Sequence, residues 1–421
     1  MKLFTKLNKF ILLIFWLALI AIIGFLAYVN NTNDFYILHY SKNLKKIIKQ
    51  NNKDLIPKLM NDHGEIFLPK TQFKDFNFYK KKINFLKPNS CFHEECYTFY
   101  LETYKENLLL IDKSANLYYS KITDTIDYKN FKKIKTNLKL ISITDLYVNN
   151  DDIYISGYTK NENDMFALSV YKSSIKNLDK IKFNKIFQES DENCTSTFPP
   201  HLGGKMKYYK NDNLDGLLLT TGLILRTDTS DIKSIPEDSI CGKILILENN
   251  NYSHKIFSKG HRNILGLYVD EKLVLATDNG PRGGDEINNI FHNKNYGWPI
   301  ASYGTLYNRK KSQEKIHYEK NHKKNNFEEP IFAFTPSIGI SEIIKLPNSF
   351  SDFWQDNFLI GSLNKKTLYR VKFDDKFNKL LFFEEMFIGD RIRDIVYLKD
   401  EKMIIMSLEF SGSIGIIQNI K

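Results

Sequence analysis

The chain has 421 residues and a mass of 49.4 kDa; with 42% hydrophobic and 14% aromatic residues, it can bury a sizeable core. A charged fraction of 26% with only 20 glycines and 11 prolines excludes a collagen-like or wholly disordered chain, and a single long apolar stretch excludes a polytopic membrane protein. The net charge of +11 is spread along the chain without a basic arm or a nucleic acid binding motif, so we expect no nucleic acid partner.

The first predicted element is a membrane anchor. The run Phe10–Val29 carries no charge and, at about 1.5 Å per residue in a helix, is long enough to cross a bilayer. Three lysines precede it: Lys2, Lys6 and Lys9. By the positive-inside rule, residues 1–9 are then cytoplasmic and residues 30–421 lie on the periplasmic or extracellular face. A cleaved signal peptide is the alternative, but the end of the run, AYVNN, has no good small-x-small cleavage site.

The next elements are a spacer and a long β-rich domain. Residues 30–70 mix short apolar runs with lysines and predict a helical or irregular spacer. From 71 to 421, runs such as NLLLIDKS, DIYISGYT and KTLYRVKF alternate with polar turns, which predicts an all-β domain. No βαβ alternation is present. At roughly four strands a blade, the ~350 residues suit a six-bladed β-propeller, although periodicity alone leaves a double sandwich open.

The four cysteines fit an exported domain. Their even number suggests disulfides, and four cysteines allow three connectivities. We expect a local bridge between Cys91 and Cys96, and a second between Cys194 and Cys241 that joins two loops near the site. The alternative is a zinc ion bound by Cys91, His93 and Cys96 in CFHEEC, but no matching second ligand pair follows.

Glycine and proline concentrate in three segments of the second half. They are GHRNILGL at 260–267, DNGPRGGDEIN at 278–288 and NYGWP at 295–299. Glycine allows backbone carbonyls to approach an ion or ligand closely. Tight inter-strand turns capped by Asp and Asn would have the same composition, so the segments alone leave both interpretations open.

Further segments follow in an order that matches a known family. They are HLGGK at 201–205, PSI at 336–338 with LIGSL at 359–363, and RIRD at 391–394. Together with the glycine-rich segments, they resemble the soluble quinoprotein family of glucose/sorbosone and aldose sugar dehydrogenases. The resemblance covers roughly Asp151 to the C-terminus. It implies a six-bladed β-propeller that uses pyrroloquinoline quinone (PQQ) and calcium.

The resemblance also implies roles for particular residues. His201 would be the base that takes the hydroxyl proton of the sugar, a task that suits a side chain with a pKa near neutrality. Arg262 and Asn263 would contact the quinone carbonyls and stabilise the negative charge that develops there. The backbone carbonyls of Gly280 and Pro281 would hold calcium, a Lewis acid. Turn caps and surface ion pairs are the structural alternatives for these side chains.

The RIRD segment predicts an anion site. Arg391 and Arg393 alternate on a strand-like segment, so they share one face. Paired guanidiniums suit carboxylates, and the resemblance assigns them to those of the cofactor. The alternative is a pair of solvated arginines opposite Asp390 and Asp394.

Some positions depart from the family pattern. The family commonly has a lysine directly after GSL, where this chain has Asn364, and we expect Lys365 to replace that lysine as a cofactor ligand. A displacement by one residue would turn the side chain to the other face of a strand. Ile264 and Leu265 replace the usual proline and glutamine of GHRNPQGL. In the same segment, we interpret His261 as structural.

The sequence therefore predicts a membrane-anchored quinoprotein dehydrogenase. It would oxidise an aldose-type sugar at the anomeric carbon, pass hydride to PQQ and deliver electrons to a respiratory acceptor. The alternative is a non-catalytic propeller of the same lineage that acts as a cell-envelope binding or scaffold protein. A calcium-dependent propeller hydrolase would need converging carboxylates, for which only Asp285 and Glu286 lie in a suitable loop.

Overall fold

The computed structural model describes residues 65–67, 76–91, 94–122, 130–191, 194–195, 202–223, 237–305, 318–351 and 354–419. The chain divides into two compact units, 1–59 and 60–421, and every described residue belongs to the second. The expected anchor Phe10–Val29 and the candidate base His201 lie outside the described residues. Within the described ranges, no helix is long and apolar enough to span a membrane.

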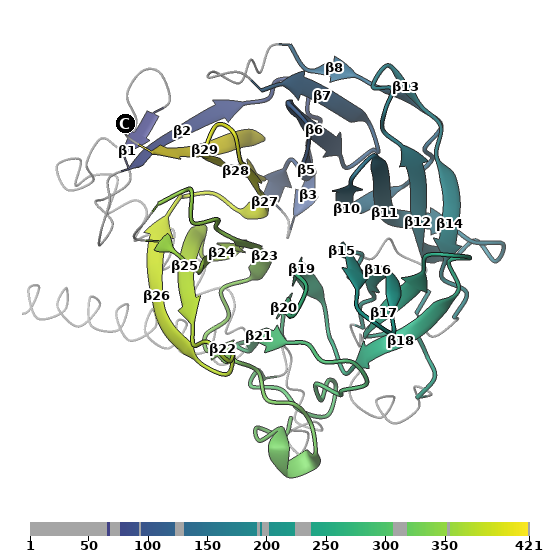
Figure 1. Ribbon diagram of the computed structural model, residues 1–421, viewed down its shortest axis with the longest axis vertical. Helices are drawn as coiled ribbons and strands as arrows, with labels where there is room; N and C mark the ends of the chain where they lie inside the picture. The colour runs from purple at the N-terminus through teal and green to yellow at the C-terminus, as the bar shows by residue number, and fades with distance from the viewer. Residues whose placement is uncertain are drawn as a thin grey trace, which may run out of the picture. The chain divides into compact units, whose positions relative to one another are not determined.

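The second unit is a six-bladed β-propeller. Its six larger sheets stand around a common centre, each with its innermost strand next to the innermost strands of the two neighbouring sheets (Figure 1). Strands that are neighbours within each of these sheets are antiparallel. The predicted all-β propeller of about six blades is confirmed, and the double sandwich is wrong.

Each blade is given from its innermost strand outward. Blade 1 has β5 (Phe99–Tyr104), β6 (Asn107–Asp112), β7 (Leu117–Lys121) and β8 (Lys132–Lys133). Blade 2 has β10 (Ser142–Asn149), β11 (Asp152–Lys160), β12 (Phe166–Ser174) and β14 (Asn184–Gln188). Blade 3 has β15 (Met206–Lys210), β16 (Asp215–Thr220), β17 (Lys243–Glu248) and β18 (His254–Lys259).

The remaining blades follow in chain order. Blade 4 has β19 (Ile264–Val269), β20 (Val274–Asp278), β21 (Asp285–Asn289) and β22 (Phe332–Phe334). Blade 5 has β23 (Ile340–Lys345), β24 (Asn357–Ser362), β25 (Thr367–Phe373) and β26 (Leu380–Phe387). Blade 6 has β27 (Ile392–Leu398), β28 (Met403–Leu408), β29 (Ser413–Asn419), β2 (Phe76–Lys82) and β1 (Glu65–Phe67). Smaller elements are the pair β3 (Asn89–Cys91) and β4 (Glu94–Cys96), the pair β9 (Lys135–Thr136) and β13 (Lys180–Ile181), and the 3-10 helix η3 (Lys323–Asn325).

Blade 6 closes the ring by joining the two ends of the domain. The early strand β2 pairs antiparallel with the last strand, β29, from Phe76 opposite Asn419 to Lys82 opposite Ser413. The still earlier strand β1 adds to the outer edge of β2, so pairing begins before the domain boundary expected at residue 71. The last strand of the chain therefore lacks a free outer edge, which protects it from pairing with other chains.

The apolar runs that predicted strands are explained by burial between blades. Middle strands such as β24 and β28 are buried along their whole length, because a neighbouring blade covers each face. Between blades 1 and 2, for example, Leu109 and Ile111 of β6 join the same core cluster as Ile153 and Ile155 of β11. The outermost strand β26 instead alternates between partly buried and exposed residues along most of its length. Burial of this kind is the main favourable term in folding.

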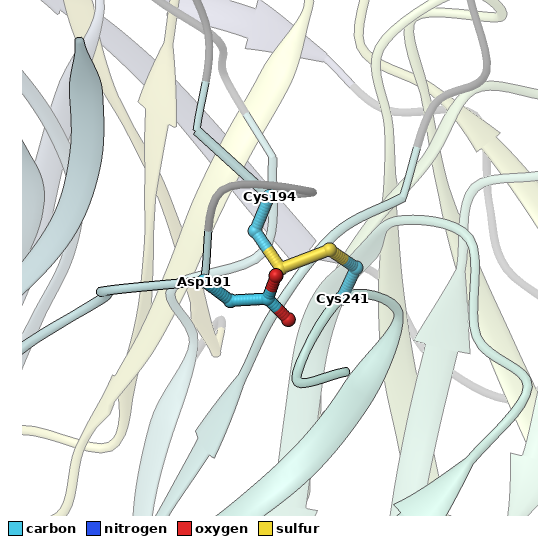
Figure 2. Close-up of side chains that lie close together, drawn as sticks. All are labelled: Asp191, Cys194 and Cys241. Atoms are coloured by element: carbon cyan, nitrogen blue, oxygen red, sulfur yellow. A yellow bond between two sulfur atoms is a disulfide. The ribbon is translucent and has the colours of Figure 1, made fainter. Parts of the chain in front are cut away.

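Both predicted disulfides are confirmed. Cys91 bonds to Cys96 with a Cα–Cα distance of 5.8 Å, and Cys194 bonds to Cys241 at 5.3 Å. The zinc alternative is therefore wrong, since the two sulfurs that it needs are bonded to each other, and His93 lies outside the described residues. Asp191 lies against the second disulfide, where its carboxylate also accepts the backbone N–H of Ile240 (Figure 2). Oxidised sulfurs are not thiolate ligands, so this group is a structural brace.

Candidate active site

The loops that carry the candidate residues are joined to one another at one end of the propeller. In antiparallel blades, the loop that enters an innermost strand and the loop between the second and third strands lie at the same end. Hydrogen bonds link these loops from blade 3 to blade 6: Gly203 N to Asn263 Oδ1, Asn279 N to Asn263 O, Gly280 N to Asp285 Oδ1, Gly339 N to Asp285 Oδ2, Leu363 N to Gly339 O, Arg391 Nη1 to Leu363 O and Glu409 N to Arg391 O. We call this end the rim. It brings together every candidate site residue that the structure describes.

Arg262 and Asn263 are fixed at the rim by Asp278. The carboxylate of Asp278 accepts both backbone N–H groups, at 2.9 Å from Arg262 and 2.6 Å from Asn263. The guanidinium of Arg262 donates to the carbonyl of Asn279 at 2.5 Å and lies 5.6 Å from the ring centre of Trp298. Burial raises the pKa of Asp278 to about 6, although the two N–H donors oppose that shift. Among the described residues, the guanidinium of Arg262 has no carboxylate partner, and the side-chain oxygen of Asn263 accepts the N–H of Gly203 at 2.9 Å.

The turn at Gly280 and Pro281 is held by Asp285. One oxygen of Asp285 accepts the N–H of Gly280 at 3.0 Å, and the other accepts three N–H groups of the loop 338–340 at 2.7 to 2.9 Å. A Cβ on Gly280 would lie 1.9 Å from the carbonyl oxygen of Gly284, so only glycine fits there. The carboxylate of Asp285 is therefore used by the loops themselves, and the carbonyl of Pro281 accepts the hydroxyl of Ser337 at 3.1 Å.

Arg391 and Arg393 share one partner, which sequence reasoning did not find. Their Nε atoms donate to the two oxygens of Glu409, at 3.0 Å and 2.8 Å. Glu409 is fully buried; burial opposes its ionisation, but the two guanidiniums outweigh burial and hold its pKa below the ordinary value. The predicted shared face of the arginines is confirmed. The alternative pairing is wrong, because Asp390 pairs with Lys80 and Asp394 faces the centre of the propeller.

Comparison with known proteins assigns the fold and the motifs to one family. A family model described as glucose/sorbosone dehydrogenase matches residues 102–415, which is more than half of the chain. The chain belongs to the glucose/sorbosone dehydrogenase family. The match begins in β5 of blade 1 and ends in β29 of blade 6, a wider extent than the resemblance from Asp151 onward.

Individual relatives agree with this assignment. Aldose sugar dehydrogenase of Escherichia coli is 28% identical over 190 residues, which are 44% of this chain and 48% of that protein. The chain spans about two fifths to one half of the length of the curated relatives it matches. The apo-form crystal structure of the soluble aldose sugar dehydrogenase from Escherichia coli has a TM-score of 0.64 and 18% identity, covering 82% of this chain and 100% of that chain. The PQQ-bound form of aldose sugar dehydrogenase from Streptomyces coelicolor has a TM-score of 0.51 and 15% identity, covering 81% and 98%.

Two lysines follow the GSL segment, and the expectation that Lys365 binds the cofactor stays a prediction. Lys365 and Asn364 are exposed, and their backbone N–H groups both donate to the carbonyl of Ile338. Lys366 is half-buried, and its ammonium lies 4.5 Å from the ring centre of Phe410. The guanidinium of Arg391 lies 5.5 Å from the same ring. Lys366 therefore has its charge on the same aromatic ring as Arg391.

A second charged group lies at the centre of the propeller, below the rim. The ammonium of Lys205, from the HLGGK segment, contacts Asp145 at 2.8 Å, Asp394 at 3.5 Å and Glu342 more closely still. These partners come from blades 2, 6 and 5, so one buried side chain ties four blades together. Burial opposes the charge of Lys205, but the three carboxylates outweigh it and hold the pKa well above the ordinary value. We call these residues, with the nearby Lys207 and Glu102, the central cluster.

Other expectations are settled by neighbouring contacts. His261 is structural as predicted: it is fully buried, its Nε2 lies 2.8 Å from Ser258 Oγ, and its ring stacks on Tyr296. Burial lowers the pKa of His261 to about 3, so the ring is neutral. The calcium-dependent hydrolase would need Asp285 and Glu286 to converge on one site. Neighbouring residues of a strand point to opposite faces, and here Asp285 holds the rim loops whereas Glu286 lies near His322.

Proposed function

We propose that this protein is a quinoprotein dehydrogenase that oxidises an aldose-type sugar at its anomeric carbon with PQQ as the hydride acceptor. The observation that carries the proposal is the set of cations fixed at the rim. Arg391 and Arg393 are held side by side by Glu409, and the ammonium of Lys366 lies on the same Phe410 ring as the guanidinium of Arg391. Arginine cannot lose its proton in a protein, and guanidiniums held in this way suit a ligand that bears carboxylates.

The residues present fit the cofactor of the family. Arg391, Arg393 and Lys366 would hold its carboxylates, because guanidinium and ammonium donors match that chemistry. Arg262 and Asn263, at the other side of the rim loops, would contact the quinone carbonyls. Bound there, the quinone supplies the hydride acceptor that the protein itself lacks.

The protein side of the reaction is proton transfer and orientation. We assign the base to His201, which would accept the hydroxyl proton of the sugar while hydride leaves the anomeric carbon, giving a lactone. The guanidinium of Arg262 is held by the carbonyl of Asn279, so its charge is already in place before substrate binds. A calcium ion would be held by the carbonyls of Gly280 and Pro281, since calcium prefers oxygen ligands.

The second candidate is a propeller of the same family that has lost the cofactor. One observation favours it: Glu409 already pairs with both arginines, and the side-chain oxygen of Asn263 already accepts the N–H of Gly203. With these hydrogen bonds formed inside the protein, the rim loops do not need a bound ligand in order to fold. Such a protein would serve as a cell-envelope binding or scaffold protein.

One experiment separates the two candidates. The purified chain is reconstituted with calcium and PQQ, and aldoses are then assayed with an artificial electron acceptor. The dehydrogenase predicts saturable cofactor binding and aldose-dependent reduction of the acceptor. His201→Ala should abolish turnover and leave cofactor binding largely intact, because it removes the base and not a cofactor ligand. Absence of cofactor binding in the wild-type chain would favour the scaffold.

We also propose that Phe10–Val29 remains as an uncleaved anchor, with the propeller outside the cytoplasm and electrons passing to a respiratory acceptor in the membrane. The supporting features are the length of the apolar run, the three lysines before it and the two disulfides, which form in oxidising compartments. N-terminal sequencing of the mature protein tests the anchor. A mature chain that begins after residue 29 would contradict it.

A further inference from the structure

Glu409 accepts four hydrogen bonds from side chains at the rim. Its Oε1 accepts Arg393 Nε at 2.8 Å and Thr98 Oγ1 at 3.0 Å, while its Oε2 accepts Arg391 Nε at 3.0 Å and Arg393 Nη2 at 3.2 Å. A carboxylate offers about four acceptor sites, so Glu409 is saturated. Every donor to Glu409 is therefore held in one arrangement.

The hairpin of β3 and β4, which the Cys91–Cys96 disulfide closes, is linked to Glu409 by hydrogen bonds. Thr98, which donates to Glu409, exchanges hydrogen bonds with the side chain of Asn89 at 2.9 and 3.2 Å. The amide nitrogen of Asn89 also lies 2.9 Å from the sulfur of Cys96. The backbone adds a direct link, from Tyr97 N to Glu409 O at 2.7 Å. The CFHEEC hairpin, with its Cys91–Cys96 bond, thus reaches the arginine pair through Thr98 and Glu409.

Two neighbouring guanidiniums repel each other, and a fixed carboxylate between them removes that repulsion. Glu409 lies between the two guanidiniums and accepts hydrogen bonds from Nε and Nη2 of Arg393, which form one edge of that guanidinium. The remaining nitrogen of Arg393, Nη1, has no hydrogen-bond partner among the described residues, and 14% of this side chain is exposed. The edge that Glu409 does not use is the edge available to a ligand.

We infer that Glu409 is a positioning residue for the cofactor site: it sets Arg391 and Arg393 in the geometry that receives a carboxylate-bearing ligand, and the Cys91–Cys96 hairpin holds it there through Thr98. This inference rests on the proposed function. Its rival is that Glu409 only neutralises charge, in which case it competes with the ligand for the same arginines. The two ideas predict effects of opposite sign when the charge of Glu409 is removed.

The test measures the dissociation constant of PQQ for the purified chain, with calcium present, by quenching of tryptophan fluorescence. Glu409→Gln keeps the shape of the side chain and adds one unit of positive charge to the rim. Positioning predicts binding at least about 10-fold weaker, because a glutamine presents a donor to one of the two arginines. Neutralisation predicts binding that is as tight as in the wild type or tighter. Glu95→Gln, on the same hairpin but exposed, is the matched control and should bind as the wild type does.

Thr98 gives a second and milder test in case Glu409→Gln does not fold. Thr98→Val removes one donor to Glu409 without changing the shape of the side chain, and we expect binding to be about 3- to 10-fold weaker. Thr98→Ser restores the hydroxyl and should restore the affinity. Equal affinity for wild type, Thr98→Val and Glu409→Gln would overturn the positioning role while leaving the proposed function in place. No binding by the wild-type chain would overturn both.

Discussion

The rim and the central cluster are two buried charge groups of opposite composition. At the rim, two guanidiniums share one carboxylate; at the centre, Lys205 and Lys207 face four acidic residues, three of them in contact with Lys205. The central cluster has more acidic than basic side chains, and it can lose this excess negative charge because a carboxyl group can take up a proton. Burial raises the pKa of Asp145, which favours its protonated form. The arginines of the rim stay charged at every physiological pH. The centre therefore suits a structural role, and the rim suits the anion site that we propose.

The largest effect should come from the central cation. Lys205→Met leaves three buried carboxylates without their shared partner, and we expect the free energy of unfolding to fall by roughly 3–5 kcal/mol. Chemical denaturation of the purified chain measures this loss. Lys210→Met is the control, since Lys210 pairs with Asp215 at the surface and should cost at most about 1 kcal/mol. A loss as small for Lys205 as for Lys210 would show that the cluster does not tie the blades together.

The acidic excess at the centre should appear as a dependence of stability on pH. Burial raises the pKa of Glu102 from 4.5 to about 7. Because the folded state holds this proton more tightly than the unfolded state, the stabilisation is complete below about pH 4.5 and is lost as the pH rises through 7. Glu102→Gln should remove roughly 1–3 kcal/mol of the difference between the free energies of unfolding at pH 5 and pH 8.

The exposed Glu106 provides the control for that measurement. Its carboxylate pairs with Lys121 at the surface, where both side chains are well exposed. Glu106→Gln should therefore leave the pH dependence unchanged. If Glu102→Gln also leaves the pH dependence unchanged, the carboxyl groups of the central cluster are ionised throughout this range. The proposal that they take up a proton would then be wrong.

The smallest effect separates two adjacent lysines at the rim. Lys366→Ala removes the ammonium that lies on the Phe410 ring beside Arg391, so PQQ should bind about 3- to 10-fold more weakly. Lys365→Ala removes an exposed side chain and should change the dissociation constant less than about twofold. The titration used for Glu409 measures both. The reverse order of effects would favour Lys365, the residue expected from the sequence, as the cofactor ligand.

Much of this architecture could be predicted from the sequence. Apolar runs such as MIIMSL predicted strands because middle strands are buried on both faces, and period-two alternation placed Arg391 and Arg393 on one face. The even number of cysteines predicted disulfides, and the structure contains the two expected pairs out of three possible connectivities. The ordered motifs predicted the family, which the match over residues 102–415 confirms.

The rest depends on contacts that no local pattern contains. Glu409 meets Arg391 because the loop after β28 returns to the start of β27, and Lys205 meets its three carboxylates only when four blades surround one centre. The place of Lys366 on the Phe410 ring has a local reason: Lys366 adopts a left-handed backbone conformation with a φ of 56°, so the regular alternation of side chains along a strand does not apply to it. Left-handed positions without glycine are hard to foresee from sequence.

The claim that the rim is a cofactor site is tested most directly by titrating the purified chain with PQQ in the presence of calcium. The wild-type chain should bind one PQQ saturably, and Arg391→Ala should weaken binding at least about 10-fold, because one of the two guanidiniums that receive carboxylates is gone. The free energy of unfolding without cofactor, measured for both proteins, separates loss of the site from loss of the fold. Saturable binding that Arg391→Ala does not change, or no binding by the wild-type chain, would contradict the account.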